Sequence, residues 1–407
     1  MERNLIEETE KDLAAEFEAA ERIEEVRTRA ILDSFRVHQV SYRHFAGTTG
    51  YGYDDIGRDT LEKIYADIFH AEAALVRPQI GSGTSALSLT LFALVRPGER
   101  ILSATGLPYD TLHGVIGIGG ECPGSLREMG VGFDCVELRD GKIDVEAVEK
   151  AMTPQTTLVI AQRSRGYAWR RSLMPQDFRE LAEMVHKHPG VRLMVDNCYG
   201  EFVREDEPTD YGADVCVGSL IKNPGGGIAP TGGYVVGSRE AVERVAWRLT
   251  APGLGREIGS YAGDYRPFYQ GLFMAPHTVC QALKTAMLAA GVFERMGMTT
   301  APGSHEERAD IIQAIQFGTP DRLVAFCRGI QSMSPVDSMA APEPWDMPGY
   351  DDPVVMAAGT FVAGASIELS ADGPMREPYT AYMQGGLTYA HGRMAVREAA
   401  ERVDRGR

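Results

Sequence analysis

Six short apolar runs, each followed by a polar or helical stretch, constrain the fold more than any other feature of this sequence. They are RILSAT (100–105), DCVEL (134–138), TLVIAQ (157–162), VRLMVD (191–196), DVCVGS (214–219) and GGYVVGS (232–238). Runs of this length, rich in Val, Ile and Leu and separated by helical patterns, are typical of a mostly parallel sheet covered on both faces. The predicted fold class is therefore α/β. Polar residues just after each strand are expected to gather where ligands bind.

The segments before and after these runs predict the domain organisation. Residues 5–35 repeat apolar positions at helical spacing, and a polar stretch rich in glycine and tyrosine follows them. From about Ala275 the pattern changes to a helix and then to mixed helix and strand segments, which indicates a second, smaller α+β domain. We predict a helical arm over 1–50, a large domain over 51–275 and a small C-terminal domain over 276–407.

Composition and charge argue against several classes of partner. The net charge of −16 repels a phosphate backbone and an anionic membrane surface, so neither nucleic acid nor membrane is an expected partner. No apolar run approaches the roughly 20 residues of a membrane span, and the acidic N-terminus lacks the features of a secretion signal.

The pair His186 and His188 is expected to lie at the solvent-exposed end of a helix and not to bind a metal. Six cysteines without a CxxC pair suit reduced thiols in the cytoplasm, with no metal site: Cys122, Cys135, Cys198, Cys216, Cys280 and Cys327.

One lysine stands in an unusual place. Lys222 lies in GSLIKNPGGGIAPTGG (218–233), in a chain with only 7 lysines and 34 arginines, and Asp196 ends the run VRLMVD. A carboxylate and a lysine at two strand ends can hold pyridoxal phosphate, because the amine forms an imine with its aldehyde and the carboxylate keeps its ring nitrogen protonated. Arginine, which is always protonated, cannot do this. On spacing alone, an ordinary surface lysine at a strand end is an equally good interpretation.

Two further stretches favour the cofactor interpretation. QIGSGTSALSLTLFALV (79–95) sets glycines and hydroxylated residues at the start of a predicted helix, where free N–H groups bind phosphate. An ordinary Ser/Thr-capped helix would have the same pattern. GLPYDTLHG brings Tyr109 to the same sheet edge, where its ring can stack on a cofactor or simply pack.

The order of these features is similar to that of fold-type I pyridoxal-phosphate enzymes, and seven strings resemble the methionine γ-lyase-like family, also called the aluminium-resistance or cystathionine β-lyase-like family. The resemblance covers about residues 40–395. It implies the fold-type I transferase fold with a mostly parallel seven-stranded sheet, a homotetramer built from intimate dimers, and chemistry at the β or γ carbon of an amino acid. The strings are YDDIGRDTLEKIYADIF, TGLPYDTLHGVIG, RSRGYAWRRSL, VDNCYGEF, GSLIKNPGGGIAPTGGY, SPVDSMAAPEPWDMPGY and GTFVAGASIELSADGPMREPY.

The resemblance implies a role for individual cofactor-binding residues. It makes Lys222 the imine lysine, Asp196 the partner of the ring nitrogen and Tyr109 the stacking ring. It assigns the phosphate to Ser82, Gly83, Thr84 and Ser219.

The resemblance also implies partner and substrate contacts. Tyr53 and Arg58, on the loop GYGYDDIGRD, would reach the phosphate of the neighbouring subunit, or else they belong to a plain loop with a surface ion pair. Arg376 is the first candidate for the substrate α-carboxylate, because the arginine fork suits a carboxylate. Arg165 competes for this role, on the loop after TLVIAQ together with Gln162.

The predicted activity is a lyase in which Lys222 removes the Cα proton, and γ-elimination is favoured over β-elimination. The leaving group can be a thiol, a thioether sulfur or a halide.

The identity of the substrate stays open because the sequence differs from the family pattern at one position. The family's phosphate loop often reads Gly-Thr-His-Ala, whereas this chain has Ser85 in place of the histidine. The arginine-rich composition suggests a GC-rich genome, so an unsaturated amino acid from a halogenated substrate is an alternative product. An aminotransferase or decarboxylase on the same fold is another alternative, whereas a non-enzymatic binder would be expected to lack Lys222 or Asp196.

Overall fold

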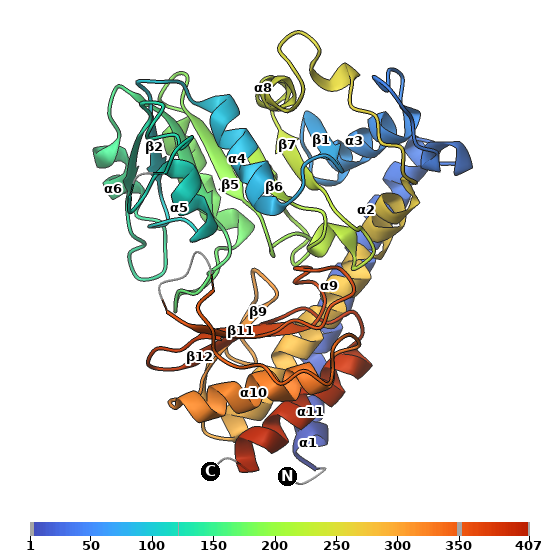
Figure 1. Ribbon diagram of the computed structural model, residues 1–407, viewed down its shortest axis with the longest axis vertical. Helices are drawn as coiled ribbons and strands as arrows, with labels where there is room; N and C mark the ends of the chain where they lie inside the picture. Colours follow the sequence, from blue (N-terminus) through green and yellow to red (C-terminus); the bar gives the residue numbers. More distant parts are fainter. Residues whose placement is uncertain (1–3, 121, 348–351, 406–407) are drawn as a thin grey trace.

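The large domain is built on a seven-stranded sheet in the order β1-β7-β6-β5-β4-β2-β3 (Figure 1). The computed structural model describes residues 4–120, 122–347 and 352–405, so the end of the string SPVDSMAAPEPWDMPGY, residues 348–350, lies outside the described residues. β7 pairs antiparallel with β1 and β6, and the remaining pairs are parallel. This confirms the predicted mostly parallel sheet. Its strands are β1 (Ala73–Arg77), β2 (Arg100–Ser103), β3 (Gly132–Cys135), β4 (Thr156–Gln162), β5 (Arg192–Asp196), β6 (Val215–Ser219) and β7 (Gly233–Gly237).

Both faces of this sheet are buried, which explains why its strands read as nearly continuous apolar runs. In β5, Leu193 and Val195 belong to one core and Met194 to the other. Helices α4, α5 and α8 contribute to the core of Met194, whereas α3, α6 and α7 contribute to the opposite core. Their bounds are α3 (Ile56–Ile68), α4 (Gly83–Leu94), α5 (Thr111–Ile116), α6 (Val145–Ala151), α7 (Arg179–Val185) and α8 (Arg239–Leu249).

All six predicted runs overlap strands, with two differences in detail. The run DCVEL was placed at 134–138, whereas β3 begins at Gly132 and ends at Cys135. β1, the seventh strand, was not among the predicted runs. It follows α3 closely, so its apolar residues read as a continuation of the pattern of that helix.

Helix α9 (Arg266–Arg295) joins the two domains (Figure 1). Its 30 residues span about 45 Å. Its first half supplies Leu272 and Val279 to a large-domain core, and its second half supplies Leu288 and Phe293 to the small-domain core. The predicted boundary at 275/276 therefore falls inside one continuous helix that contains Pro276.

The N-terminal arm consists of α1 (Asn4–Asp12) and α2 (Ala14–Val37), and both helices pack against α9. Ile6 of α1 enters the small-domain core, whereas Ile31 of α2 enters a large-domain core. The arm thus connects both domains. Short 3₁₀ helices occupy Tyr42–Phe45, Pro175–Phe178, Pro208–Tyr211, Asn223–Gly225 and Gly255–Glu257.

The small domain is a five-stranded antiparallel sheet in the order β10-β11-β12-β9-β8, backed by two helices. One face, which includes Ala371 and Met383, packs into a core with the helices, while Ile312, Ala314 and Tyr382 on the other face pack against tyrosines of the large domain. The elements are β8 (Thr299–Ala301), β9 (Ile312–Gln316), α10 (Pro320–Ser332), β10 (Val354–Ala357), β11 (Ser370–Pro374), β12 (Thr380–Gln384) and α11 (Tyr389–Arg405).

Within the described ranges, no helix is both long and apolar enough to cross a membrane.

His186 directly follows α7 and contacts Asp214, with 3.1 Å between the ring nitrogen and a carboxylate oxygen. Its side chain is partly exposed, as a helix-end position predicts.

Candidate active site

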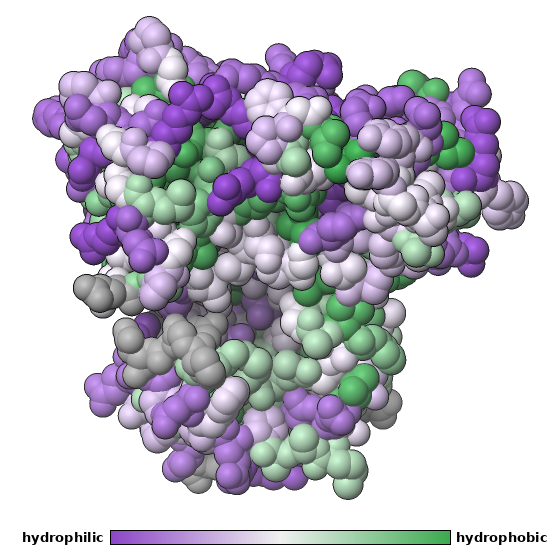
Figure 2. Space-filling model, turned by 45° about the horizontal axis from the view of Figure 1, so that its top comes forward, coloured by the Kyte–Doolittle hydropathy of each residue, from purple (hydrophilic) through white to green (hydrophobic). Residues whose placement is uncertain are grey.

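A cavity lies where the carboxyl ends of the large-domain strands meet the small-domain sheet, and residues of both domains line it. Figure 2 shows a recess between the two domains. The residues that line the cavity are Gly83, Thr84, Leu87, Tyr109, Thr111, Leu112, Gln162, Ser164, Gly166, Tyr167, Asp196, Cys198, Tyr199, Lys222, Ile312, Asp372, Tyr382 and Gln384.

Lys222 stands after β6 on a loop that packs closely against α9. A Cβ atom on Gly225 would lie 1.8 Å from the carbonyl oxygen of Leu220, and one on Gly271 of α9 would lie 2.4 Å from the Gly225 carbonyl oxygen. Glycine is therefore required at both positions. The Asn223 amide donates hydrogen bonds of 3.0 and 2.9 Å to two backbone carbonyl oxygens after β5. These contacts fix the position from which the lysine side chain enters the cavity.

The amine of Lys222 lies over the ring of Tyr199, with Nζ 3.9 Å from the ring centroid. Burial opposes the positive charge, but Cys198, Tyr199 and Asp196 together outweigh this effect, and the pKa of Lys222 is raised. Tyr199 has a φ of +73°, which residues other than glycine rarely adopt. Such strained conformations collect at functional positions, and here the conformation places an aromatic ring against the lysine.

Asp196, the last residue of β5, also lines the cavity. One of its carboxylate oxygens accepts a hydrogen bond of 3.1 Å from the backbone N–H of Cys198. Burial raises the pKa of Asp196, and the charge of Lys222 only partly offsets this. A buried carboxylate is stabilised by a nearby cation, so a protonated ring nitrogen is a partner that suits Asp196.

The start of α4 and the end of β6 form the third part of the site. The Ser82 hydroxyl caps α4 by accepting a 3.0 Å hydrogen bond from Ser85 N–H, and Gly83 and Thr84 line the cavity. A Cβ atom on Gly83 would lie 3.2 Å from the Cβ of Ser219, so this position is tight. The Ser219 hydroxyl is buried and has no hydrogen-bond partner within the described part of the chain. Free helix N–H groups and an unpaired hydroxyl together suit a phosphate.

Tyr109 follows β2 and is fixed by the end of β4. Its backbone N–H donates a 2.8 Å hydrogen bond to Oε1 of Gln162, whose Nε2 donates at 3.0 Å to the carbonyl oxygen of Ser164. The rings of Tyr109 and Tyr167 meet edge to face with their centroids 6.3 Å apart. The structure thus brings Lys222, Asp196 and Tyr109 to one cavity.

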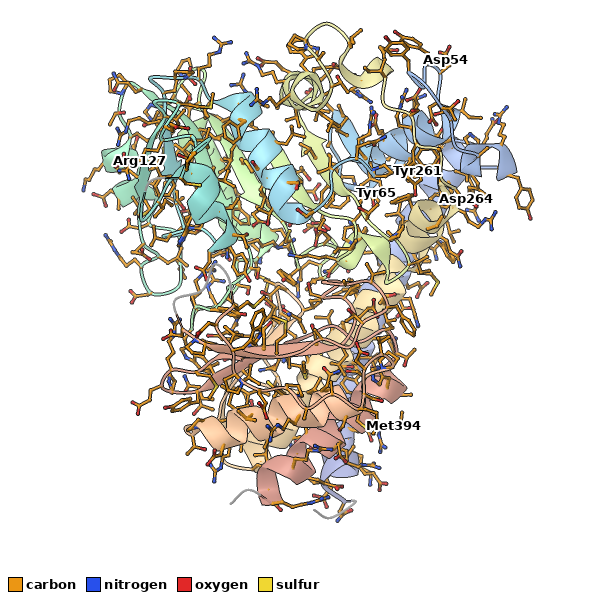
Figure 3. All side chains as sticks on the ribbon, viewed as in Figure 1. Asp54, Tyr65, Arg127, Tyr261, Asp264 and Met394 are labelled. Atoms are coloured by element: carbon orange, nitrogen blue, oxygen red, sulfur yellow. The ribbon has the colours of Figure 1, made fainter. Side chains whose placement is uncertain are left out.

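Tyr53 and Arg58 do not line this cavity. Tyr53 is 56% exposed and stacks on Tyr51, and Figure 3 places its neighbour Asp54 at the outer edge of the large domain. The prediction that Arg58 lies on a loop is wrong. It belongs to the first turn of α3, because Asp55 caps the helix by accepting a 2.9 Å hydrogen bond from Arg58 N–H. Its guanidinium is buried and donates to the carbonyl oxygen of Gly52 at 2.8 Å.

Arg165 and Arg376 line an adjoining cavity, together with Tyr109 and Gln162. Arg376 is exposed and pairs with Asp352, with 3.0 Å between nitrogen and oxygen. Arg165 is buried; it donates a 2.8 Å hydrogen bond to a backbone carbonyl oxygen, and its Nε has no partner in the described ranges. Burial lowers the pKa of Arg165, and an anion would satisfy the unpaired donor.

The sequence analysis missed most of the cavity wall that the small domain supplies. Asp372, Tyr382 and Gln384 lie on one face of β11 and β12, where strand alternation could have grouped them. Tyr199 was also missed, although it follows Asp196 by only three residues. Ser85, where the sequence departs from the family pattern, is exposed and hydrogen-bonded to Ser82.

Comparison with known proteins identifies the family. The profile of methionine gamma-lyase matches residues 2–404. The chain belongs to the methionine gamma-lyase family. The protein is therefore a pyridoxal-phosphate-dependent lyase, and the unpaired Ser219 hydroxyl, the start of α4 and the buried pair of Lys222 and Asp196 fit this cofactor.

Similar proteins cover nearly the whole chain. The uncharacterised protein YnbB of Bacillus subtilis is 50% identical over 397 residues, which are 97% of this chain and 94% of YnbB. A candidate cystathionine beta-lyase involved in aluminium resistance from Listeria monocytogenes has a TM-score of 0.96 at 46% identity, over 99% of this chain and 100% of that one. A carbon-sulfur lyase involved in aluminium resistance from Clostridium novyi has a TM-score of 0.94 at 47% identity, over 98% and 95%.

Proposed function

We propose that this lyase cleaves a carbon–sulfur bond by eliminating a γ leaving group from an α-amino acid. The observation that supports this most directly is that Lys222, Asp196 and Tyr109 line one cavity beside the start of α4. The family gives the reaction class, and the Clostridium novyi relative supports sulfur as the leaving atom.

In this proposal the chain's own residues hold the cofactor and move the proton. When bound, pyridoxal phosphate supplies an aldehyde that joins to an amine and a ring that withdraws the electron pair of the substrate Cα–H bond. Lys222, released when the substrate amine replaces it, removes the Cα proton. Asp196 keeps the ring nitrogen protonated. The residues proposed to bind the cofactor are Lys222, Asp196, Tyr109, Ser82, Gly83, Thr84 and Ser219, and Tyr53 and Arg58 of a neighbouring subunit.

The substrate α-carboxylate is proposed to bind to one of two arginines, Arg376 or Arg165. Arg165 has the stronger support, because its Nε is buried without a partner among the described residues, whereas Arg376 already pairs with Asp352. Substrate affinity of Arg376→Ala and Arg165→Lys tests this assignment. If Arg376→Ala leaves the affinity unchanged, the carboxylate belongs to Arg165; a large loss in Arg376→Ala alone assigns it to Arg376.

γ-Elimination needs a second proton removal, at Cβ, before the leaving group departs. The test is NMR in deuterium oxide with norleucine, which has no leaving group: exchange of both α and β protons supports γ chemistry. β-Elimination is the second candidate, favoured by the Listeria monocytogenes relative. Exchange confined to the α position, with turnover of β-substituted amino acids only, would assign the enzyme to that class.

A substrate screen by mass spectrometry identifies the leaving group and the retained carbon skeleton. Release of a thiol with ammonia and a 2-oxo acid supports the carbon–sulfur lyase. Release of halide with an unsaturated amino acid would identify the alternative product. Carbon dioxide or amino-group transfer without elimination would contradict the lyase proposal and indicate a decarboxylase or an aminotransferase.

We further propose a cytoplasmic homotetramer in which neighbouring subunits share each site. The exposed Tyr53 supports this arrangement, because it lies outside its own cavity and is free to contact another chain.

A further inference from the structure

The small domain places one acidic side chain in the wall of the active-site cavity. Asp372 lies on β11, where it pairs in register with Met356 of β10 and Tyr382 of β12. The residue before it, Ala371, packs into the small-domain core on the opposite face. Strand alternation therefore turns Asp372 toward the cavity, which Lys222 also lines.

The carboxyl group of Asp372 is buried and only partly satisfied. The residue is 8% exposed, and its Oδ1 is buried without a hydrogen-bond partner among the residues that the structure describes. The Tyr167 side chain hydrogen-bonds to the carboxyl group, so this bond falls on the other oxygen. Tyr382 in turn donates a 2.6 Å hydrogen bond to the backbone carbonyl oxygen of Tyr167. Tyr167 therefore holds the carboxyl group and is itself held by Tyr382, while one carboxyl oxygen remains available to a ligand.

Burial raises the pKa of Asp372 to about 7, so near neutral pH much of the population holds a proton. The phenol beside it is a much weaker acid, since burial raises the pKa of Tyr382 to about 12. A cysteine thiol has a pKa of roughly 8.5, so a thiolate is a stronger base than the Asp372 carboxylate. Proton transfer from Asp372 to a departing thiolate is therefore downhill, whereas transfer from Tyr382 is uphill.

We propose that Asp372 is the acid that protonates the leaving sulfur. This role rests on the proposed carbon–sulfur lyase activity. The bond from carbon to sulfur breaks, its electron pair leaves with sulfur, and the proton of Asp372 forms the S–H bond. Lys222 removes the Cβ proton after it has passed on the Cα proton, and the electron pair left at Cβ forms the new double bond between Cβ and Cγ as the sulfur departs. Asp372, left as a carboxylate, regains a proton from solvent, and Lys222 returns its proton there, so no oxidant or reductant is needed.

The test is a leaving-group series measured on holoenzyme. Wild type, Asp372→Asn and the exposed small-domain control Asp321→Asn are given S-alkyl and S-nitrophenyl derivatives of one amino acid. An alkyl thiolate needs a proton to leave, whereas a nitrothiophenolate does not. We expect Asp372→Asn to lose about 10²- to 10⁴-fold in kcat/KM on the alkyl substrate and less than about threefold on the nitrophenyl substrate. Asp321→Asn should resemble wild type on both.

Norleucine exchange in deuterium oxide separates this role from structural damage. Asp372→Asn should bind the cofactor and exchange the α proton as wild type does, because the acid acts after that step. An equal loss on both sulfur substrates, or a lost α exchange, overturns the role of Asp372 alone. If wild type exchanges the α proton but cleaves neither sulfur substrate, the proposed function fails and this role fails with it.

Wild type provides a second test should Asp372→Asn not accumulate as folded protein. The groups that face Asp372 are Met356, Tyr167 and Tyr382, with Lys222 and Asp196 in the same cavity. The dependence of kcat/KM on the pKa of the leaving thiol should steepen above pH 7, as Asp372 loses its proton. A dependence that stays constant from pH 6 to 8 contradicts the proposal.

Discussion

At the residue scale, Lys222 is fixed by its loop and by the Tyr199 ring, so its amine is the one expected to hold the cofactor. Borohydride, which fixes the cofactor to the amine that holds it, should label Lys222 in peptide mapping of the purified protein. Lys222→Ala should abolish the covalent label, and the exposed control Lys63→Ala should keep it. A label on another lysine would disprove the assignment.

Asp196 provides a second prediction at the same scale. Its buried carboxylate should hold the proton of the ring nitrogen by a charge-assisted hydrogen bond. Such a bond contributes about 1.5–3 kcal/mol, so Asp196→Asn should retain the cofactor but exchange the substrate α proton roughly 10- to 100-fold more slowly. The measurement is α-deuterium incorporation by NMR. Exchange at the wild-type rate would rule out this role.

At the element scale, the start of α4 has free N–H groups that can bind a phosphate. They can do so only if the phosphate comes close to the helix backbone. Gly83→Ala would place a methyl group 3.2 Å from the Ser219 Cβ and narrow the phosphate site. Cofactor affinity should fall by about tenfold, or about 1.4 kcal/mol. Gly81→Ala is the matched control, since a Cβ there meets nothing within 4 Å. Equal affinities of the two variants, by equilibrium dialysis, would contradict the phosphate assignment.

The segment after β5 makes the stability of the cofactor-free protein depend on pH. Burial raises the pKa of Glu201 to about 8, although Tyr234 donates a 2.8 Å hydrogen bond to its Oε1. Between about pH 4.5 and 8 the unfolded chain releases this proton and the folded chain keeps it. Glu201 therefore makes stability fall as pH rises through this window, by at most about 1.4 kcal/mol per pH unit.

Urea unfolding from pH 5 to 8 tests this contribution. Glu201→Gln, which cannot ionise, should show a smaller decline in unfolding free energy than wild type over this range. Identical pH slopes for the two proteins would show that Glu201 is ionised in the folded state.

At the scale of the whole molecule, the N-terminal arm and α9 hold the two domains in one arrangement around the cavity. Arg27 of α2 contacts Glu207 at 3.1 Å, and Arg163 beside β4 contacts the same carboxylate at 3.2 Å. All three side chains are buried, so removing one of them would leave an uncompensated charge. The position of the arm relative to the catalytic domain is thereby fixed.

Sharing of sites between subunits leads to a prediction at this scale. Tyr53→Ala and Lys222→Ala, each of low activity alone, should recover activity when mixed as hybrids, because some sites then combine two intact halves. Tyr53 is a better probe than Arg58, whose buried guanidinium also stabilises its own chain. Tyr42→Ala, 90% exposed, is the control. No recovery in verified hybrids would mean that each chain completes its own site.

The sequence by itself determined the sheet and the residues at its strand ends. Lys222, Asp196 and Tyr109 could be predicted together because the carboxyl ends of parallel strands meet at one edge, and that geometry follows from the order of short apolar runs. The start of α4 was predictable for the same local reason, since small hydroxylated residues precede an apolar helix.

Only the tertiary structure decided what closes the cavity. Asp372 and Tyr382 come from an antiparallel sheet, and alternation groups them on one face without saying which domain that face meets. The answer depends on α9, which belongs to both cores and sets the small-domain sheet against the large domain. Arg58 was misplaced for a local reason, because the loop string runs into the helix that Asp55 caps; its burial, by contrast, depends in part on a segment 199 residues away. Packing between distant segments has no local signature in the chain.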